Sequence, residues 1–298
     1  MTIYTHAESN IRKTWMLIFG FLVFIIGLGW VFSRIFQNPS ILFFAVIFSL
    51  IMNVLSFWHS DKIVLALSRA KEIKHQENPE LYHIVENLCI TAGLPLPKIY
   101  LIPENQINAF ATGRDKDHAA IAVTKGVLEK LDKTDLEGVI SHELSHIGNK
   151  DMLLMTIVVV LVGFVSIASD WFLRSMWWGG LRRRGGDNEG GQAGSILALA
   201  GIVLAILSPF IALLIQLAIS RKREFLADAS GSLLTRYPDG LANALAKIAA
   251  DNTPMKTAST ATAHLYIANP FRGKRFLTLF MTHPPIEERI KALREMEI

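Results

Sequence analysis

The sequence predicts a mainly helical α+β membrane protein, with four hydrophobic membrane helices and a small β-sheet in the polar remainder. Of its 298 residues, 51% are hydrophobic and only 19% are charged, whereas about 25% of residues are charged in an ordinary soluble domain. Four long stretches carry no ionisable side chain at all. This composition excludes a disordered chain and a collagen-like repeat. It also excludes a disulfide-bonded secreted scaffold, because Cys89 is the single cysteine.

The first two apolar stretches predict an N-terminal membrane hairpin of two transmembrane helices, residues 1–58. Residues 14–33 form a run of 20 without an ionisable side chain, which is about the length that a helix needs to cross the hydrocarbon core. A polar turn and a second run, residues 41–58, follow. A cleaved signal peptide is the alternative for the first run. We expect an anchor instead, because no small-residue cleavage site follows and a second span comes at once.

Residues 152–219 predict a second membrane hairpin, inserted into the polar part of the chain. Its apolar runs are residues 152–169 and, roughly, 195–219, with Pro209 as the expected kink in the second. Between them lies a Gly/Arg-rich stretch, residues 179–194, which is typical of a flexible linker. All six tryptophans lie near the ends of the four runs, where interfacial rings are expected.

Basic residues near the apolar runs predict the orientation of the chain in the membrane. Arg12 and Lys13 precede the first run, and further basic residues follow the second and the fourth. By the positive-inside rule, both termini and the polar segments then face the cytoplasm. Arg174 and the arginines at 182–184 do not follow this rule, because they lie between the third and fourth runs, on the predicted outer side. Either the earlier spans determine the topology, or the second hairpin is partly sheltered by protein rather than fully spanning.

The polar segments 59–151 and 220–298 are expected to form one cytoplasmic domain. Asn78 and Pro79 predict the start of a helix that ends at Gly93. Thr134 and Glu137 match a capping box for a later helix. Between these helices the sequence predicts three short strands of a small sheet, residues 98–102, 107–111 and 119–124.

The most informative motif is the segment His142-Glu143-Leu144-Ser145-His146. On a helix, residues four apart share one face, so His142 and His146 can direct their imidazoles at one ion. Two imidazoles and a carboxylate suit Zn²⁺ and leave one position open for water. Glu143 can then take the proton of that water. The sequence therefore predicts a catalytic site with one Zn²⁺ per chain, rather than a surface helix with incidental histidines.

The third ligand is predicted to be Glu224, which lies four residues before Asp228. Because both carboxylates share a helix face, one can bind the metal while the other accepts the free N–H of a ligating imidazole. A helix with solvated charges after a membrane span is the alternative. The inserted hairpin favours the metal site, since it would return the chain to the side and height at which it entered the membrane.

Several motifs together resemble the HtpX family of membrane zinc metalloproteases, and more distantly the CAAX prenyl proteases. They are the segment 142–151, the Glu224 and Asp228 pair, the segment 108–113 and Thr282-His283-Pro284-Pro285, in the same order. The resemblance implies a zincin-like cytoplasmic metalloprotease domain, Zn²⁺ bound by His142, His146 and Glu224, and a catalytic Glu143. It also implies a multi-pass protein of the bacterial inner membrane. Such a protein would cleave misfolded or damaged membrane proteins on the cytoplasmic side without ATP.

Two further elements are candidates for the active site. The segment Asn108, Ala109, Phe110 and Ala111 is typical of an edge strand, to which an extended substrate can add by backbone hydrogen bonds. Asn108 is a candidate hydrogen-bond partner for that backbone; an ordinary sheet strand is the alternative. By the resemblance, His283 lies near the zinc and stabilises the oxyanion, although a lone histidine is more often structural.

The sequence favours a zinc endopeptidase whose partners are polypeptides, membrane proteins among them, and the lipid bilayer. A net charge of +4 gives no support for a nucleic-acid partner, and no nucleotide is expected. A protease that processes one peptide or a lipidated C-terminus is a narrower alternative. A membrane scaffold or transporter with a structural metal site is an alternative of another class. The predicted spans carry few polar residues beyond Asn53 and Gln216, which argues against transport.

Overall fold

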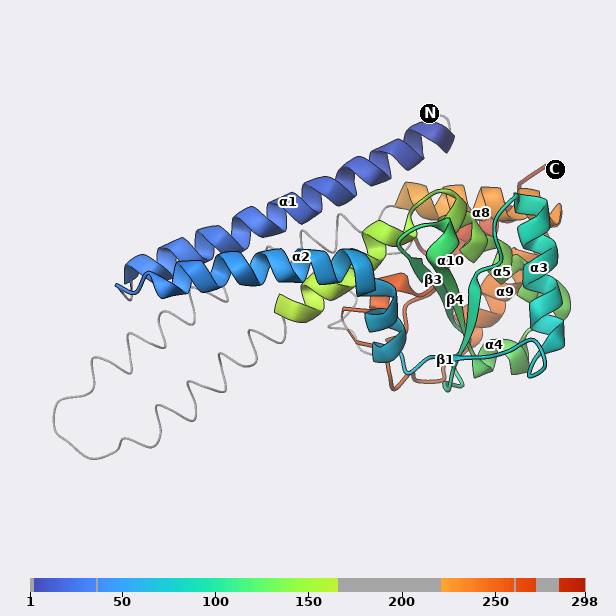
Figure 1. The fold of residues 1–298 in the computed structure, drawn as a ribbon. Coiled ribbons are helices and arrows are strands. Elements are labelled where there is room, and N and C mark those ends of the chain that lie inside the picture. Colours follow the sequence, from blue (N-terminus) through green and yellow to red (C-terminus); the bar gives the residue numbers. More distant parts are fainter. Residues whose placement is uncertain (1–2, 36, 166–220, 260, 272–283, 298) are drawn as a thin grey trace.

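The computed structural model of this chain describes residues 3–35, 37–165, 221–259, 261–271 and 284–297. Within them, two long N-terminal helices lead into a domain in which helices surround a small mixed sheet (Figure 1). The predicted fourth apolar run, the linker 179–194 and the end of the third run lie outside the described residues.

Two apolar helices, α1 (Ile3–Ile35) and α2 (Ser40–Leu67), form an antiparallel pair that projects from the domain (Figure 1). The segments Glu8–Arg34 and Ser40–Leu67 are long and apolar enough to cross a membrane. Large apolar side chains stand exposed along the pair; Phe19, for example, is 68% exposed and Phe43 69%. Such exposure is expected where side chains face lipid rather than water. The N-terminal pair of apolar helices is therefore confirmed.

The described part of the third apolar run is a helix, Met152–Val165, that follows the preceding helix α5 (Lys133–Gly148) at an angle of 86°. Most of its side chains are buried, and those of Leu154, Ile157 and Leu161 are wholly so. It packs against α2 through Phe164 and Phe48, whose ring centroids lie 4.5 Å apart. This part of the run is therefore covered by protein.

The sheet has the strand order β1-β2-β4-β3, with β2 parallel to β4 and the other neighbours antiparallel. Strands β2 (Lys98–Ile102) and β4 (Ala119–Thr124) have the predicted bounds. The third strand, β3 (Ala109–Gly113), begins two residues later than predicted. Strand β1 (Lys71–Glu72) was not predicted, because two exposed charged residues carry no strand pattern.

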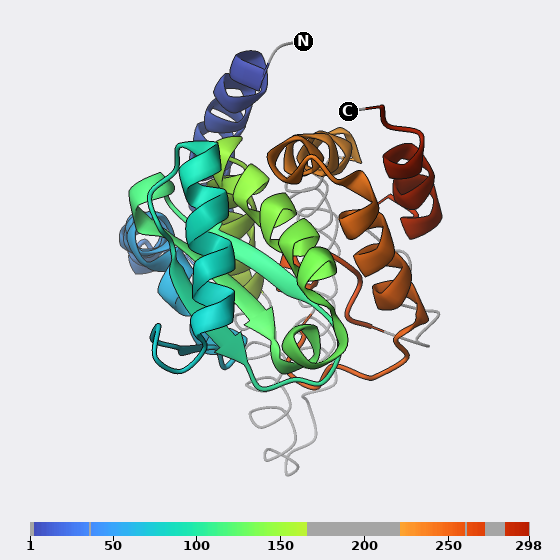
Figure 2. The same ribbon diagram turned by 90° about the vertical axis from the view of Figure 1, so that its right-hand side faces the viewer.

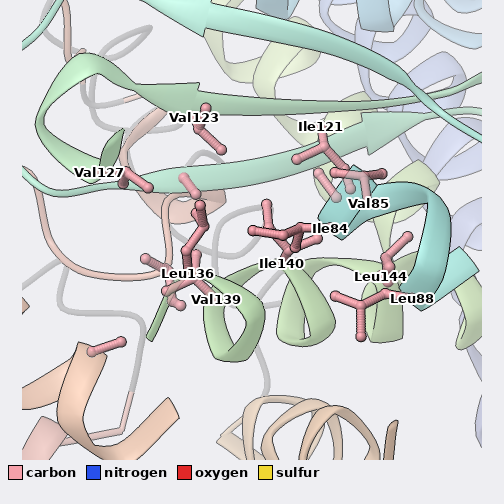
Figure 3. Close-up of a cluster of buried hydrophobic side chains, with 14 of the residues drawn as sticks. Ile84, Val85, Leu88, Ile121, Val123, Val127, Leu136, Val139, Ile140 and Leu144 are labelled. Atoms are coloured by element: carbon pink, nitrogen blue, oxygen red, sulfur yellow. The ribbon is translucent and has the colours of Figure 1, made fainter. Parts of the chain in front are cut away.

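Alternate strand residues face two separate hydrophobic layers. On one face, Ile121 and Val123 pack against α5 and α3 (Pro79–Ala92), as Figure 3 shows. Figure 2 shows α3 lying across the sheet. On the other face, Phe110 and Ala122 pack against the end of α2 and the helix Met152–Val165. Burial on both faces explains why β3 and β4 contain no exposed position.

The predicted boundaries of α3 are confirmed, whereas the predicted cap of α5 is not. The Asn78 side chain accepts a hydrogen bond from the Leu81 amide at 3.0 Å, and Gly93 ends α3 with a φ of +66°, both as predicted. The capping box at Thr134 is wrong. Asp132 is the N-cap of α5 and accepts from the Asp135 amide at 3.0 Å, while the Thr134 hydroxyl donates to Asp132.

The rest of the domain consists of shorter elements. Helices α8 (Arg221–Thr235) and α9 (Pro238–Ala250) pack beside α5, and α10 (Ile286–Arg294) packs against α9 and α8. The remaining short elements are helix α4 (Lys125–Lys130) and the 3₁₀ turns η1 (Lys116–His118) and η2 (Ala263–Leu265).

Candidate metal centre and active site

Helices α5 and α8 bring the predicted ligands together in the interior of the domain. His142, Glu143 and His146 lie on α5, and their exposed fractions are between 1% and 4%; Glu224 lies on α8 and is 5% exposed. The two helices approach closely at Gly231, where an added Cβ would lie 2.9 Å from the His142 backbone nitrogen. Only glycine permits this distance, so Gly231 helps to set the separation of the two helices.

The three predicted ligands converge on one point. The Nε2 atoms of His142 and His146 lie 3.2 Å apart. The Glu224 carboxylate places Oε2 3.9 Å from Nε2 of His142 and Oε1 3.7 Å from Nε2 of His146. One ligand atom from each of the three residues can be chosen so that all lie within 4.8 Å of one another. Two imidazoles and one carboxylate form a donor set that suits Zn²⁺.

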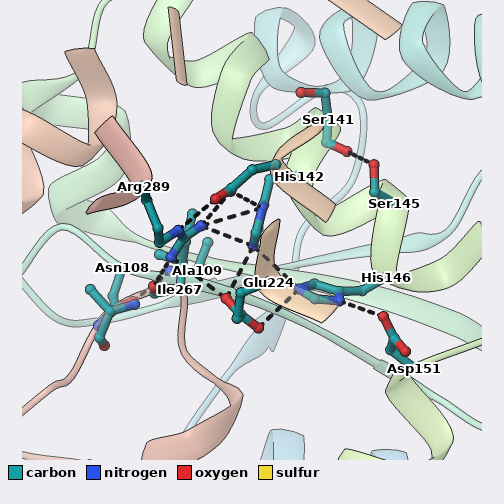
Figure 4. A network of polar contacts seen from close by, with 12 residues as sticks. Asn108, Ala109, Ser141, His142, Ser145, His146, Asp151, Glu224, Ile267 and Arg289 are labelled. Atoms are coloured by element: carbon teal, nitrogen blue, oxygen red, sulfur yellow. Dashed lines mark hydrogen bonds and ion pairs between the residues drawn. The ribbon is translucent and has the colours of Figure 1, made fainter. Parts of the chain in front are cut away.

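Each of the two imidazoles also has a carboxylate at its other nitrogen (Figure 4). Asp228 Oδ1 lies 2.9 Å from Nδ1 of His142, and Asp151 Oδ2 lies 3.1 Å from Nδ1 of His146. A carboxylate at Nδ1 holds the proton there, so that Nε2 keeps its lone pair for a metal ion. The donor set and its outer partners therefore fit a bound metal.

Arg289 of α10 was not predicted as part of the site, yet it is wholly buried there. It donates from Nε and Nη2 to the Asp228 carboxylate, at 2.8 and 2.6 Å, and from Nη1 to the Ile267 carbonyl oxygen. Although burial opposes ionisation, Arg289 and His142 hold the pKa of Asp228 below its usual range. A sequence signal existed, since helical spacing places this arginine on the same stripe as Ile286 and Leu293.

Glu143 lies beside the three ligands with its carboxylate against β3. The Ala111 backbone N–H donates to it, and burial raises its pKa to about 7. Its Oε1 atom is buried without a hydrogen-bond partner among the residues that the structure describes. A carboxylate with a pKa near neutrality and a free oxygen is suited to accept a proton from a reacting water.

Strand β3 is an edge strand next to α5, but its first residues already have partners in the chain. The Ile267 N–H donates to the Ala109 carbonyl oxygen at 3.0 Å. The Asn108 side chain donates from Nδ2 to the Ala268 carbonyl oxygen at 3.0 Å, and its Oδ1 accepts from the Ala268 N–H at 3.3 Å. The Phe110 side chain lies in the other hydrophobic layer, away from α5. The predicted substrate role of Asn108 thus stays a prediction, and His283 lies outside the described residues.

Comparisons with known proteins agree with this arrangement. Residues 75–297 match peptidase family M48. The chain is 45% identical over 299 residues to a protease HtpX homolog of Caldanaerobacter subterraneus subsp. tengcongensis, covering 100% of this chain and 99% of that protein. It is 44% identical over 297 residues to a protease HtpX homolog of Thermoanaerobacter pseudethanolicus, covering 99% and 98% of the two chains.

A solved structure shares the fold. The crystal structure of S. mikatae Ste24p superposes with a TM-score of 0.52 at 17% identity, covering 97% of this chain and 67% of that one. With the two apolar helices, these similarities indicate a membrane-bound metalloprotease. The chain therefore belongs to peptidase family M48 and to the HtpX proteases.

Proposed function

We propose that this protein is a zinc endopeptidase, with His142, His146 and Glu224 as the metal ligands and Glu143 as the general base. The observation that carries the proposal is the convergence of the two Nε2 atoms and the Glu224 carboxylate, with Glu143 beside them. When bound, Zn²⁺ supplies a Lewis acid that polarises a carbonyl and acidifies water. Asp228 and Asp151 hold the imidazole tautomers that such a site needs.

In the proposed reaction, Glu143 accepts a proton from the attacking water while the oxygen of that water bonds to the scissile carbonyl carbon. Glu143 then delivers that proton to the peptide nitrogen, which leaves as the amine when the C–N bond breaks. The pKa of about 7 that burial gives Glu143 suits both halves of this transfer. His283 is proposed as a donor to the oxyanion by the sequence resemblance alone.

The substrate is proposed to bind in extended form along β3, and residues Asn108 to Ala111 are proposed to form the centre of the binding site. Residues alternate in an antiparallel edge strand, so the backbone of Ala109 and Ala111 points outward. Ala109 already accepts from Ile267, and the Ala111 N–H donates to Glu143, so the substrate is proposed to pair with the Ala111 carbonyl oxygen. Recognition through backbone hydrogen bonds depends little on side-chain identity, which supports a broad preference for unfolded segments.

The biological setting is proposed from the same features. A domain formed by 59–151 and 220–298, zincin-like and next to the apolar helices, would cleave misfolded or damaged membrane proteins at the cytoplasmic face of the bacterial inner membrane. The hairpins would be 1–58 and 152–219, with both termini cytoplasmic. No nucleotide is needed for this reaction. Processing of one specific peptide is the alternative, and comparing cleavage products across a membrane proteome distinguishes the two.

The test is the substitution Glu143→Gln in the full chain purified in detergent. We expect about one zinc ion per chain, as for a single site, with hydrolysis of an unfolded protein substrate nearly abolished. Glu137→Gln makes the same chemical change on the same helix, away from the ligands, and should leave activity unchanged. Undiminished hydrolysis by the Glu143 variant would remove Glu143 as the base.

A further inference from the structure

The N-terminal helix α1 places one polar side chain in the interior of the domain. Asn10 is only 3% exposed, although it lies in the segment Glu8–Arg34 that is apolar enough to span a membrane. Figure 1 shows this end of α1 near the domain and its other end far away. A buried amide is retained where its hydrogen bonds are satisfied by specific partners.

The partners of Asn10 lead directly to one metal ligand. Its Nδ2 donates to Asp151 Oδ1 at 2.5 Å and lies 3.3 Å from the Asn149 carbonyl oxygen. The other oxygen of Asp151 is the one that lies 3.1 Å from Nδ1 of His146. Asp151 is wholly buried, so the amide donor and the imidazole together determine how its carboxylate is oriented.

Asn10 also contacts the element that carries the third ligand. Its Oδ1 accepts from Arg223 Nη1 at 3.4 Å, and Arg223 Nε lies 3.7 Å from Asp151 Oδ1. Arg223 immediately precedes Glu224 in α8. The Asn10 side chain therefore bonds both to Asp151, in the loop after α5, and to Arg223, at the beginning of α8. It thus links the two helices that supply all three ligands.

We propose that Asn10 is a positioning residue of the metal centre: through Asp151 it orients His146, and it makes α1 part of the outer layer of the site. The inference rests on the proposed metal ligands. If Asn10 served only to anchor α1 to the domain, its amide would not need to bond the Asp151 carboxylate, which holds His146. Outer partners of metal ligands typically contribute about 10–100-fold in metal affinity.

The experiment uses the full chain in detergent, stripped of metal and titrated with Co²⁺, whose visible spectrum depends on coordination geometry. We expect Asn10→Ala to weaken Co²⁺ binding by about 10–100-fold and to change the spectrum. Thr14→Val is the matched control. Thr14 is 2% exposed on the same helix, and its hydroxyl donates to the Asn10 carbonyl oxygen rather than to Asp151, so its variant should match the wild type.

A double-mutant cycle tests whether Asn10 acts through Asp151. In an Asp151→Ala background, Asn10→Ala should change Co²⁺ affinity much less than it does in the wild type, because the carboxylate that accepts the Asn10 bond is already absent. Should Asn10→Ala fail to fold, Asn10→Leu keeps approximately the size of the side chain but has no donor for Asp151, and the same loss is expected.

The outcomes separate the two claims. Unchanged Co²⁺ affinity and spectrum in the Asn10 variants, or fully additive effects in the cycle, would overturn this inference while leaving the proposed ligands intact. A wild-type protein that binds no Co²⁺ would overturn the metal centre itself, and this inference with it.

Discussion

The Arg289 guanidinium and the Asp228 carboxylate form a two-point ion pair in the interior of the domain, with bonds of 2.8 and 2.6 Å. Asp228 at the same time contacts His142. The pair therefore joins α10 to α8 and, through the imidazole, to the helix that carries the metal motif.

Replacing Arg289 by Met should strongly destabilise the protein. The change leaves the Asp228 carboxylate buried without its cation, and removal of one partner of a buried pair costs about 3–5 kcal/mol. Urea unfolding in detergent measures the loss. Arg294→Met, at the exposed end of the same helix, should change the free energy of unfolding by less than about 0.5 kcal/mol. Equal effects at the two positions would contradict the structural importance of the pair.

Glu224→Gln should weaken metal binding by more than the roughly 10–100-fold that outer partners contribute. The amide is neutral and a poorer ligand than the carboxylate for a divalent ion. Competition with a chromogenic chelator gives the affinity, and Glu287→Gln on the exposed face of α10 serves as the control. Full metal occupancy at wild-type affinity in the Glu224 variant would require a different third ligand.

Gly231→Ala should displace α8 from α5. The new Cβ would lie 2.9 and 3.1 Å from the backbone nitrogen and Cα of His142, atoms that cannot move independently. We expect a loss of about 1–3 kcal/mol in the free energy of unfolding and weaker metal binding. Gly148→Ala on α5 meets no atom within 4 Å, so it should be neutral or slightly stabilising. A tolerated alanine at 231 would show that the helices are not held at this distance.

Asp251 should contribute to acid sensitivity. Burial opposes its ionisation, but hydrogen bonds from Thr253 and the Ile107 amide, together with Lys130, lower its pKa to about 2. In the unfolded chain the pKa is about 3.9. Above about pH 4, the ionised Asp251 carboxylate therefore stabilises the folded state. This stabilisation, at most about 2 kcal/mol, is lost as the pH falls from about 4 to 2.

The variant Asp251→Asn should consequently be less stable than the wild type at neutral pH and approach it near pH 2. Thermal unfolding across this pH range measures the convergence. Asp117→Asn, at an exposed turn, should follow the wild-type profile throughout. A constant difference between Asp251→Asn and the wild type at all pH values would rule out the proposed linkage.

Features that depend on neighbouring residues in the chain were predictable from the sequence. His142 and His146 share a face because helical periodicity requires it, and the cap at Asn78 depends on a side chain and an amide three residues apart. Strands β2 and β4 were predicted because short apolar runs lie between turn residues.

Features that depend on distant parts of the chain were not. β3 begins at Ala109 because the Ile107 amide donates to Asp251, far along the sequence, instead of to a strand. The stripe with Ile286 and Leu293 indicates that Arg289 faces the core, but it does not identify Asp228 as the partner. Asn10 looks like a helix-end residue until the loop after α5 is placed beside it. Their roles follow from tertiary contacts, which no local pattern encodes.

The central claim is tested most directly by anomalous diffraction at the zinc edge from crystals of the full chain. The account predicts one peak, at about 2.0–2.2 Å from Nε2 of His142, Nε2 of His146 and a Glu224 carboxylate oxygen. A peak elsewhere, or a Glu224 carboxylate directed away from the ion with another residue in its place, would contradict it.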